Sequence, residues 1–293
     1  MSSSGTKVGF VGTGVMGAPM VGHLLDAGYE VAVYNRSPGK TRALVEAGAV
    51  LCDSPGEVAP GASFVITMVG YPSDVEEVYL GPGGIMERAE RGTVLIDMTT
   101  SSPVLAVRLA AEAERRGLHI LDAPVSGGER GAREACLVVM AGGPDEAFSA
   151  AESLLRVFGD TVVLHGAAGS GQHAKVANQI AVAASMIGAC EALAYAQAAG
   201  LDPERVRATI AGGAAGSWTL ANLAPRMLAG DMAPGFYVKH FVKDLGIALA
   251  SAQESGVELP GLRLAHELYS RLEASGAGDS GTQALYEAYV AER

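Results

Sequence analysis

A glycine-rich turn near the N-terminus constrains the fold of this chain more than any other feature. The turn, Gly12-Thr13-Gly14-Val15-Met16-Gly17, follows an apolar run at residues 7–11 and precedes a helical pattern at 18–27. Its first glycine allows a tight bend, its second lets a ligand approach the backbone, and its third lets helix and strand pack closely. The helix N-terminus adds amide donors and partial positive charge. Strand, turn and helix together predict a site for the pyrophosphate of a dinucleotide.

The first half of the chain alternates short apolar runs with helical patterns. Runs typical of buried strands lie at residues 7–11, 30–34, 64–68, 93–97 and 118–121, and helical patterns lie at 18–27, 40–47 and 104–116. Continuous apolar strands separated by helices predict a parallel sheet covered on both faces. Two further β-like runs, at 136–141 and 161–165, are expected to extend this sheet.

The pattern changes near residue 166, after which almost everything reads as helix. Ser170 is expected to cap a long helix that runs to about residue 199 and stops at Gly200. Asp202 and Pro203 then begin another helix, as N-cap and first helical residue. We predict an α/β chain. A doubly wound Rossmann-type domain at 1–165 is joined through the long helix to an all-helical substrate and dimerisation domain at 166–293.

Composition excludes several classes of partner. The chain has 21 lysines and arginines against 32 aspartates and glutamates, a net charge of −11, which disfavours binding to nucleic acid or to anionic membranes. Its three cysteines are widely spaced and odd in number, as expected of free thiols in a reducing compartment. No spacing of histidine with cysteine or carboxylate indicates a metal site. We expect a cytoplasmic protein without a metal.

The long helix is apolar on most of its faces, particularly over residues 180–190. That run is shorter than the roughly 20 residues needed to cross a bilayer. A helix that is hydrophobic nearly all round must be buried nearly all round. Either a partner subunit covers it, in a homodimer or homotetramer, or its own helical domain wraps it.

The end of the second predicted strand bears on which dinucleotide binds. An acidic residue about 20 positions after the turn would accept from the ribose 2′-hydroxyl and favour NAD. Here the strand ends in Asn35-Arg36-Ser37, without an acid. Arg36 can pair with a 2′-phosphate, and Asn35 and Ser37 can add hydrogen bonds. We therefore predict that NADP is preferred and NAD is the second cofactor, the alternative for Arg36 being a solvated loop arginine.

Lys175 and Asn178 lie three residues apart near the start of the long helix and so share one of its faces. Reduction of a carbonyl needs a proton donor for the oxygen as hydride reaches the carbon. We place Lys175 in the first turn, where the helix dipole and burial are expected to lower its pKa toward the useful range. Asn178 would hold the lysine or the substrate hydroxyl. A lone lysine is more often a surface side chain, so this hypothesis depends on the surrounding pattern.

Four segments supply that pattern: Gly-Phe-Val-Gly-Thr-Gly-Val-Met-Gly (9–17), Asp-Ala-Pro-Val-Ser-Gly-Gly (122–128), Gly-x-Gly-Gln-x-x-Lys-x-x-Asn (169–178) and Lys-Asp-Leu (243–245). In content and order they resemble the β-hydroxyacid dehydrogenase family. This family includes 3-hydroxyisobutyrate dehydrogenase, tartronate semialdehyde reductase and glyoxylate/succinic semialdehyde reductases. The resemblance spans most of the chain.

The resemblance implies an NAD(P)-dependent oxidoreductase that interconverts a small 3-hydroxyacid and its semialdehyde or oxo acid by hydride transfer. It makes Lys175 the general acid/base and Asn178 its catalytic companion. It also assigns the substrate carboxylate to a short turn whose amides can form an anion nest; this turn is Ser126-Gly127-Gly128. Further cofactor contacts would come from Met68, Val69, Gly70, Thr100 and Lys243.

Two alternatives stay open at this point. One is an imine reductase-like enzyme of the same fold, although such relatives generally lack the lysine. The other is a catalytically silent cofactor-binding protein that kept the fold and lost the chemistry. A silent protein would be expected to lack part of the set formed by Lys175, Asn178 and the turn at 126–128, and the whole set is present.

Overall fold

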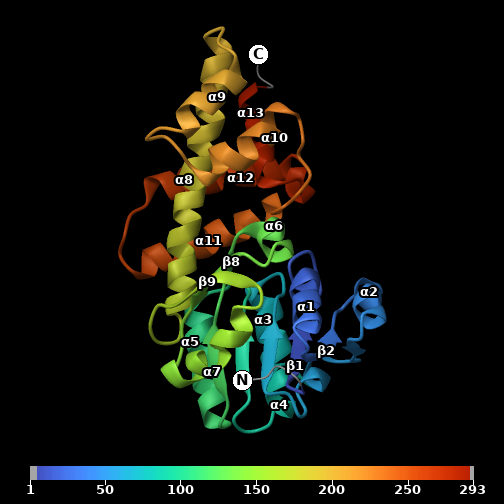
Figure 1. Ribbon diagram of the computed structural model, residues 1–293. Coiled ribbons are helices and arrows are strands. Elements are labelled where there is room, and N and C mark those ends of the chain that lie inside the picture. The colour runs from blue at the N-terminus through green and yellow to red at the C-terminus, as the bar shows by residue number, and fades with distance from the viewer. Residues whose placement is uncertain (1–4, 291–293) are drawn as a thin grey trace. The chain divides into compact units, whose positions relative to one another are not determined.

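The computed structural model describes residues 5–290 (Figure 1). The chain divides into two compact units, Met1–Lys175 and Val176–Arg293. The first is an α/β unit and the second is helical. The boundary predicted from the change of pattern, between residues 165 and 166, stays a prediction.

Six parallel strands form the main sheet of the first unit, in the order β3-β2-β1-β4-β5-β6. The strands are β1 (Lys7–Val11), β2 (Glu30–Tyr34), β3 (Val50–Leu51), β4 (Phe64–Thr67), β5 (Val94–Asp97) and β6 (His119–Asp122). This is the strand order of a Rossmann-type, doubly wound sheet. The predicted fold class is therefore confirmed, and the predicted strands agree with the observed ones to within a residue or so at each end.

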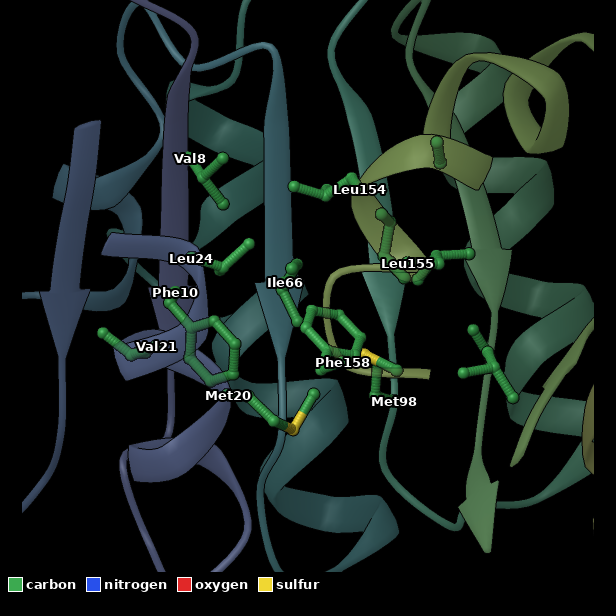
Figure 2. Close-up of a cluster of buried hydrophobic side chains, with 14 of the residues drawn as sticks. Val8, Phe10, Met20, Val21, Leu24, Ile66, Met98, Leu154, Leu155 and Phe158 are labelled. Atoms are coloured by element: carbon green, nitrogen blue, oxygen red, sulfur yellow. The ribbon is translucent and has the colours of Figure 1, made fainter. Parts of the chain in front are cut away.

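Side chains on one face of the sheet form a continuous core with two helices (Figure 2). Phe10 of β1 and Ile66 of β4 are fully buried there. They belong to one cluster with residues of α1 (Gly17–Asp26) and α7 (Asp145–Leu155). Full burial of such a side chain contributes roughly 1.5–3 kcal/mol. This core fixes α1, and with it the glycine turn that precedes it.

The opposite face has a core of its own. Val11, Val65 and Leu95 point to that side, because successive side chains of a strand alternate between faces. They pack with α3 (Pro72–Leu80), α4 (Ile85–Arg88) and α5 (Pro103–Arg115). Short segments complete the unit: η1 (Pro38–Thr41), α2 (Arg42–Glu46), η2 (Pro55–Val58) and α6 (Gly128–Arg133). Since both faces are covered, the middle residues of β1, β4 and β5 are buried and apolar on both sides of the sheet.

A second sheet corrects the prediction for the last two β-like runs. They form β8 (Leu137–Ala141) and β9 (Gly159–Leu164), which join β7 (Val125–Ser126) in a separate three-stranded sheet. The prediction that they extend the main sheet is wrong because β7, which follows β6 almost at once, pairs antiparallel with β8. A single antiparallel bridge, between Asp122 and Gly142, connects the two sheets.

The second unit is built from helices around one apolar core. Its elements are α8 (Ser170–Ala198, which begins in the first unit), α9 (Pro203–Ala211), η3 (Thr219–Leu223), α10 (Ala224–Leu228), α11 (Val238–Glu254), α12 (Pro260–Ala274), η4 (Ala277–Asp279), η5 (Thr282–Ala284) and α13 (Leu285–Val290). Asp202 caps α9 as predicted, since its Oδ1 accepts from the amides of Glu204 (3.0 Å) and Arg205 (3.3 Å). Gly200, predicted to stop α8, has a φ of +73°.

The long helix α8 is buried along one side only. Met186, Cys190 and Leu193 are fully buried in the helical core, whereas Ala181 and Gly188 are exposed. By length and composition α8 could also cross a membrane, and 33% of its most apolar window is buried. Core helices of soluble proteins have the same length and composition, so this is weak evidence for a membrane.

Candidate active site

The glycine turn has the geometry that the sequence predicts for a phosphate-binding turn. Gly12 has a φ of +101°, which favours glycine, and a side chain there would collide with the carbonyl of Met68. A Cβ at Gly17 would overlap the carbonyl of Gly12, so the turn and the first residue of α1 touch directly. A Cβ at Gly14 would meet nothing within 4 Å, which leaves the backbone open to a ligand.

Thr13 provides an independent test of whether a dinucleotide phosphate fits this turn. Its side chain is 2% exposed, and its Oγ1 has no hydrogen-bond partner among residues 5–290. A buried hydroxyl without a partner costs free energy, and a bound ligand is one way to satisfy it. Val15 and Met16 complete the turn, with Val15 exposed and Met16 half-buried. The open face at Gly14 and the unpaired hydroxyl of Thr13 fit a phosphate oxygen.

At the end of β2, Arg36 has a partner that the sequence interpretation missed. Its Nη1 lies 3.4 Å from Oδ1 of Asp74, which belongs to the first turn of α3. The Arg36 side chain is 84% exposed, and the Nδ2 of Asn35 donates to the carbonyl of Ser37 at 2.9 Å. The strand order could have indicated this pair. Because β2 and β4 both flank β1, the loop after β2 and the helix after β4 begin at the same edge of the sheet.

The loops after β4 and β5 are fastened to each other. The amide of Val69 donates to Oγ1 of Thr99 at 3.0 Å, and the Thr99 amide donates to Oδ1 of Asp97 at 3.1 Å. The same Asp97 oxygen accepts from Oγ1 of Thr67 at 2.8 Å. The segment at 68–70 and the half-buried Thr100 are thereby held at the carboxyl end of the parallel sheet, where doubly wound folds bind ligands.

The turn proposed for a substrate carboxylate lies between β7 and α6. Gly127 and Gly128 have φ values of +126° and +62°, so this conformation favours glycine at both positions. Ser126 ends β7 and is half-buried. Successive amides in such a turn can face one anion.

The beginning of α8 is capped by a carboxylate from a distant strand. Oδ1 of Asp122, the last residue of β6, accepts from the Gly169 amide at 2.7 Å, and Oδ2 accepts from the Gln172 amide at 2.8 Å. Ser170, predicted to cap the helix, is instead its first residue, and Asp122 rather than Ser170 accepts these two amides. The side chain of Gln172 bonds to the loop after β5, donating to the Thr99 carbonyl (2.8 Å) and accepting from the Ser101 amide (2.9 Å).

Burial changes the acidity of this capping group. It raises the pKa of Asp122 from 3.8 to about 6, and the negative charge of Asp97 adds to the increase. The amides of Gly169 and Gln172 act in the opposite direction, because they stabilise the carboxylate. A raised acid pKa is more common at functional sites than elsewhere.

Lys175 is a buried amine at the start of α8, with 6% of its surface exposed. It is the sixth residue of the helix, so the prediction that it lies in the first turn is wrong by about one turn. The helix dipole weakens beyond the first turn, so it acts on Lys175 less than the sequence interpretation assumed.

In the second unit, Asn178 begins a chain of buried polar contacts. Its Nδ2 donates to Oε1 of Gln179 at 2.8 Å, and Nε2 of Gln179 donates to Oδ2 of Asp244 at 2.6 Å. Nζ of Lys243 lies 3.0 Å from Oδ1 of Asp244, at ion-pair distance but without hydrogen-bond geometry. The predicted residues Asn178 and Lys243 are thus connected through Gln179 and Asp244.

A hollow of about 300 Å³ elsewhere on the first unit contains none of the predicted site residues. It is lined by Tyr79, Leu80, Gly81, Pro82, Glu87 and Arg116. No unpaired buried polar atom lines it. The chemistry of the chain is concentrated instead at the carboxyl ends of the strands and on α8.

A Rossmann-type sheet with a phosphate-binding turn and a buried lysine at the head of a following helix defines a dinucleotide-dependent oxidoreductase. Two family matches agree with that class. Residues 7–166 match the NAD binding domain of 6-phosphogluconate dehydrogenase, and residues 169–289 match a domain described as the NAD-binding domain of NADP-dependent 3-hydroxyisobutyrate dehydrogenase.

Relatives similar over nearly their whole length give the family. The chain is 53% identical to the uncharacterized oxidoreductase YkwC of Bacillus subtilis, covering 97% of this chain and 98% of that one. It is 37% identical to 2-hydroxy-3-oxopropionate reductase of Escherichia coli, covering 96% of each. The chain belongs to the β-hydroxyacid dehydrogenase family, that of 3-hydroxyisobutyrate dehydrogenase, and is an NAD(P)-dependent enzyme acting on CH–OH groups.

Solved structures agree with this membership. The 3-hydroxyisobutyrate dehydrogenase of Mycobacterium tuberculosis, solved with L-serine, superposes with a TM-score of 0.88 at 31% identity, covering 97% of this chain and 98% of that one. A structure of Psf3 in complex with NADP+ and 2-OPP gives 0.89 at 26% identity, covering 96% and 99%. The imine reductase of Myxococcus stipitatus gives 0.65 at 19% identity, covering 97% and 99%, which shows a shared fold only.

Proposed function

We propose that this enzyme interconverts a small 3-hydroxyacid and its semialdehyde or oxo acid, with Lys175 as general acid/base. One observation carries the proposal: Lys175 is buried three residues after Gln172, whose side chain is bonded to the loop after β5. That loop stands at the edge of the sheet where dinucleotides bind. A buried amine next to a cofactor edge suits proton transfer better than a solvated one.

The chemistry divides between cofactor and protein. A nicotinamide cofactor supplies or removes hydride at the carbon that bears oxygen. Nζ of Lys175 gives a proton to that oxygen during reduction and takes one from the hydroxyl during oxidation. Asn178, on the same face of α8, orients this exchange, and its contact with Gln179 fixes its amide.

Two further groups complete the proposed site. The amides of the turn at 126–128, with the hydroxyl of Ser126, bind the substrate carboxylate. The glycine turn binds the pyrophosphate, and the segment at 68–70, Thr100 and Lys243 contact the rest of the cofactor. Support for the carboxylate role comes from the positive φ values of Gly127 and Gly128.

We infer a preference for NADP from the residues after β2. Arg36 is exposed and carries the only guanidinium in the Asn35-Arg36-Ser37 segment, so it is available to a 2′-phosphate once it leaves Asp74. NAD remains the second cofactor.

We also infer a cytoplasmic homo-oligomer. The three cysteines, which are all free, support a reducing compartment. The exposed small residues of α8, among them Ala181 and Gly188, support self-association, because they leave part of an apolar helix uncovered. The mass in solution, measured by light scattering, tests the second inference; a monomer at micromolar concentration would refute it.

A substrate panel tests the proposed reaction. The purified enzyme is mixed with NADPH or NADH and with small semialdehydes that carry a carboxylate, and the loss of reduced cofactor is followed by absorbance. We expect turnover with these compounds, faster with NADPH, and little with matched aldehydes that lack a carboxylate. Turnover of cyclic imines in preference to every semialdehyde would favour an imine reductase, and no turnover of any substrate would favour a silent binding protein.

A further inference from the structure

We propose that Asp122 is a positioning residue whose carboxylate holds the first turn of α8, and through it Lys175, at the carboxyl ends of β5 and β6. The inference rests on the proposed role of Lys175 in proton transfer. In this role Asp122 does not contact the reacting atoms and acts through the helix backbone.

Both oxygens of the Asp122 carboxylate are used by the helix. Oδ1 accepts from the Gly169 amide and Oδ2 from the Gln172 amide, at 2.7 and 2.8 Å. The backbone of Asp122 is itself fixed, since its amide donates to the Gly142 carbonyl (3.0 Å) and its carbonyl accepts from the Gly142 amide (2.8 Å). The first amides of a helix have no partner within the helix, and here a fixed strand residue satisfies two of them.

The same turn packs directly on strand backbone. A Cβ at Gly171 would collide with the carbonyls of Asp122 and Met140, so only glycine permits this approach. Because Gly171 has no side chain, the backbone of this turn lies close enough for the Gly169 and Gln172 amides to bond to the Asp122 carboxylate. The turn therefore has little freedom to slide along the sheet edge.

The side chain of Gln172 makes a second connection between the first turn of α8 and the carboxyl edge of the sheet. Its side chain bonds to Thr99 and Ser101, and Thr99 in turn accepts from the Val69 amide. Gln172 is three residues before Lys175, so both side chains lie on one face of α8. Asp122 and Gln172 together tie the backbone under Lys175 to the loops after β4, β5 and β6.

A carboxylate at position 122 needs an explanation, because a neutral side chain that accepts the same amides would cost less free energy to bury. Serine, threonine and asparagine also cap helices well, and burial raises the pKa of Asp122 to about 6. The charged group that acts on it is Asp97, which is also negative; the other side chains around it, from Ala106, Leu109, Ile120, Leu121 and Ala168, are apolar. Only a carboxylate offers two equivalent acceptors to two amides at once.

The test compares Asp122→Asn with Lys175→Ala and with the double variant. Asparagine keeps the shape but turns an NH₂ group toward one of the two amides. We expect kcat to fall roughly 10- to 100-fold, the usual cost of a displaced catalytic group, with the KM for substrate and the Kd for cofactor unchanged. In the Lys175→Ala background, the same substitution should leave the residual kcat unchanged.

Asp202→Asn is the control, because Asp202 also accepts two amides at the start of a helix. It does so through one oxygen, Oδ1, at the N-terminus of α9, which has no buried residue. Asp202→Asn should leave kcat unchanged. If Asp122→Asn does not fold, Asp122→Ser is used, which keeps one acceptor. Failure of both variants to fold would overturn the proposal in favour of a purely structural role.

The outcomes separate this proposal from the proposed function. If Lys175→Ala retains full turnover, the role of Lys175 is wrong. If Lys175→Ala loses turnover while Asp122→Asn keeps the wild-type kcat, the role of Lys175 stands and the positioning role is wrong. An equal loss of kcat from Asp122→Asn in both backgrounds would also overturn positioning, since it would act independently of the lysine.

Discussion

The guanidinium of Arg36 lies 3.4 Å from the carboxylate of Asp74, so the residue that we assign to a 2′-phosphate already has an anionic partner. The pair joins the loop after β2 to the first turn of α3. Because Arg36 is 84% exposed, the interaction is weak, within about 1 kcal/mol. A phosphate can therefore compete with Asp74 for the arginine.

Replacing Arg36 should discriminate between the two cofactors. We expect Arg36→Ala to weaken NADPH binding roughly 10- to 100-fold, the range for losing hydrogen bonds to a charged group, and to leave NADH binding nearly unchanged. Titration of cofactor fluorescence with each dinucleotide measures both affinities. Equal losses for the two would contradict the 2′-phosphate role.

Asp74→Asn should have the opposite effect on NADPH. The substitution removes a negative charge beside the 2′-phosphate position but keeps an oxygen that can accept from the Tyr71 amide, as Asp74 Oδ2 does at 3.0 Å. Since exposed pairs contribute about 1 kcal/mol or less, we expect NADPH to bind up to about five times more tightly. An unchanged ratio of NADPH to NADH affinity would mean that Asp74 does not compete for Arg36.

How much of this site the sequence could predict depends on whether the relevant interactions are local. The glycine turn, β1 and the capped start of α9 at Asp202 were predictable, because a few neighbouring residues determine each of them. The Arg36–Asp74 pair and the Asp122 cap were not, because their partners lie 38 and about 50 residues apart.

The second sheet was unpredictable for a related reason. The apolar runs that form β8 and β9 have the composition of buried strands, but composition does not specify a pairing partner. β8 pairs on one side with β9 and on the other with the two-residue strand β7, which is too short to be recognised by its pattern. Lys175 is the sixth residue of α8, so it lies in the second turn of the helix rather than in the first.

The free energy of unfolding should depend on pH through the ionisation of Asp122. Its folded pKa, about 6, exceeds the ordinary value of 3.8, so between these pH values the folded chain keeps a proton that the unfolded chain has released. Stability from this group is therefore greatest below pH 4 and is lost as the pH rises to about 6, by roughly 3 kcal/mol in all.

Asp122→Asn removes this titration. The free energy of unfolding of the wild type, minus that of the variant, should fall between pH 4 and pH 7 when both are measured by urea denaturation. A difference that stays constant with pH would show that Asp122 does not titrate as its burial requires.

Ser126 should affect substrates only through their carboxylate. We expect Ser126→Ala to raise the KM for a carboxylate-bearing semialdehyde about 10-fold, since one hydrogen bond to a charged group is lost, with little change for an aldehyde that lacks the group. Steady-state kinetics with the matched pair measure this. The same loss for both aldehydes would indicate a general effect on the turn at 126–128.

Turnover of Lys175→Ala tests the central claim most directly. Single-turnover reduction of a semialdehyde by NADPH is measured for the variant, the wild type and Lys239→Ala, which removes a lysine from an exposed ion pair with Asp279. General acid catalysis contributes about 100- to 10,000-fold, so we predict a loss of that size for Lys175→Ala, with NADPH affinity retained and Lys239→Ala unaffected. A Lys175→Ala enzyme that binds NADPH and reduces the semialdehyde at the wild-type rate would contradict the account.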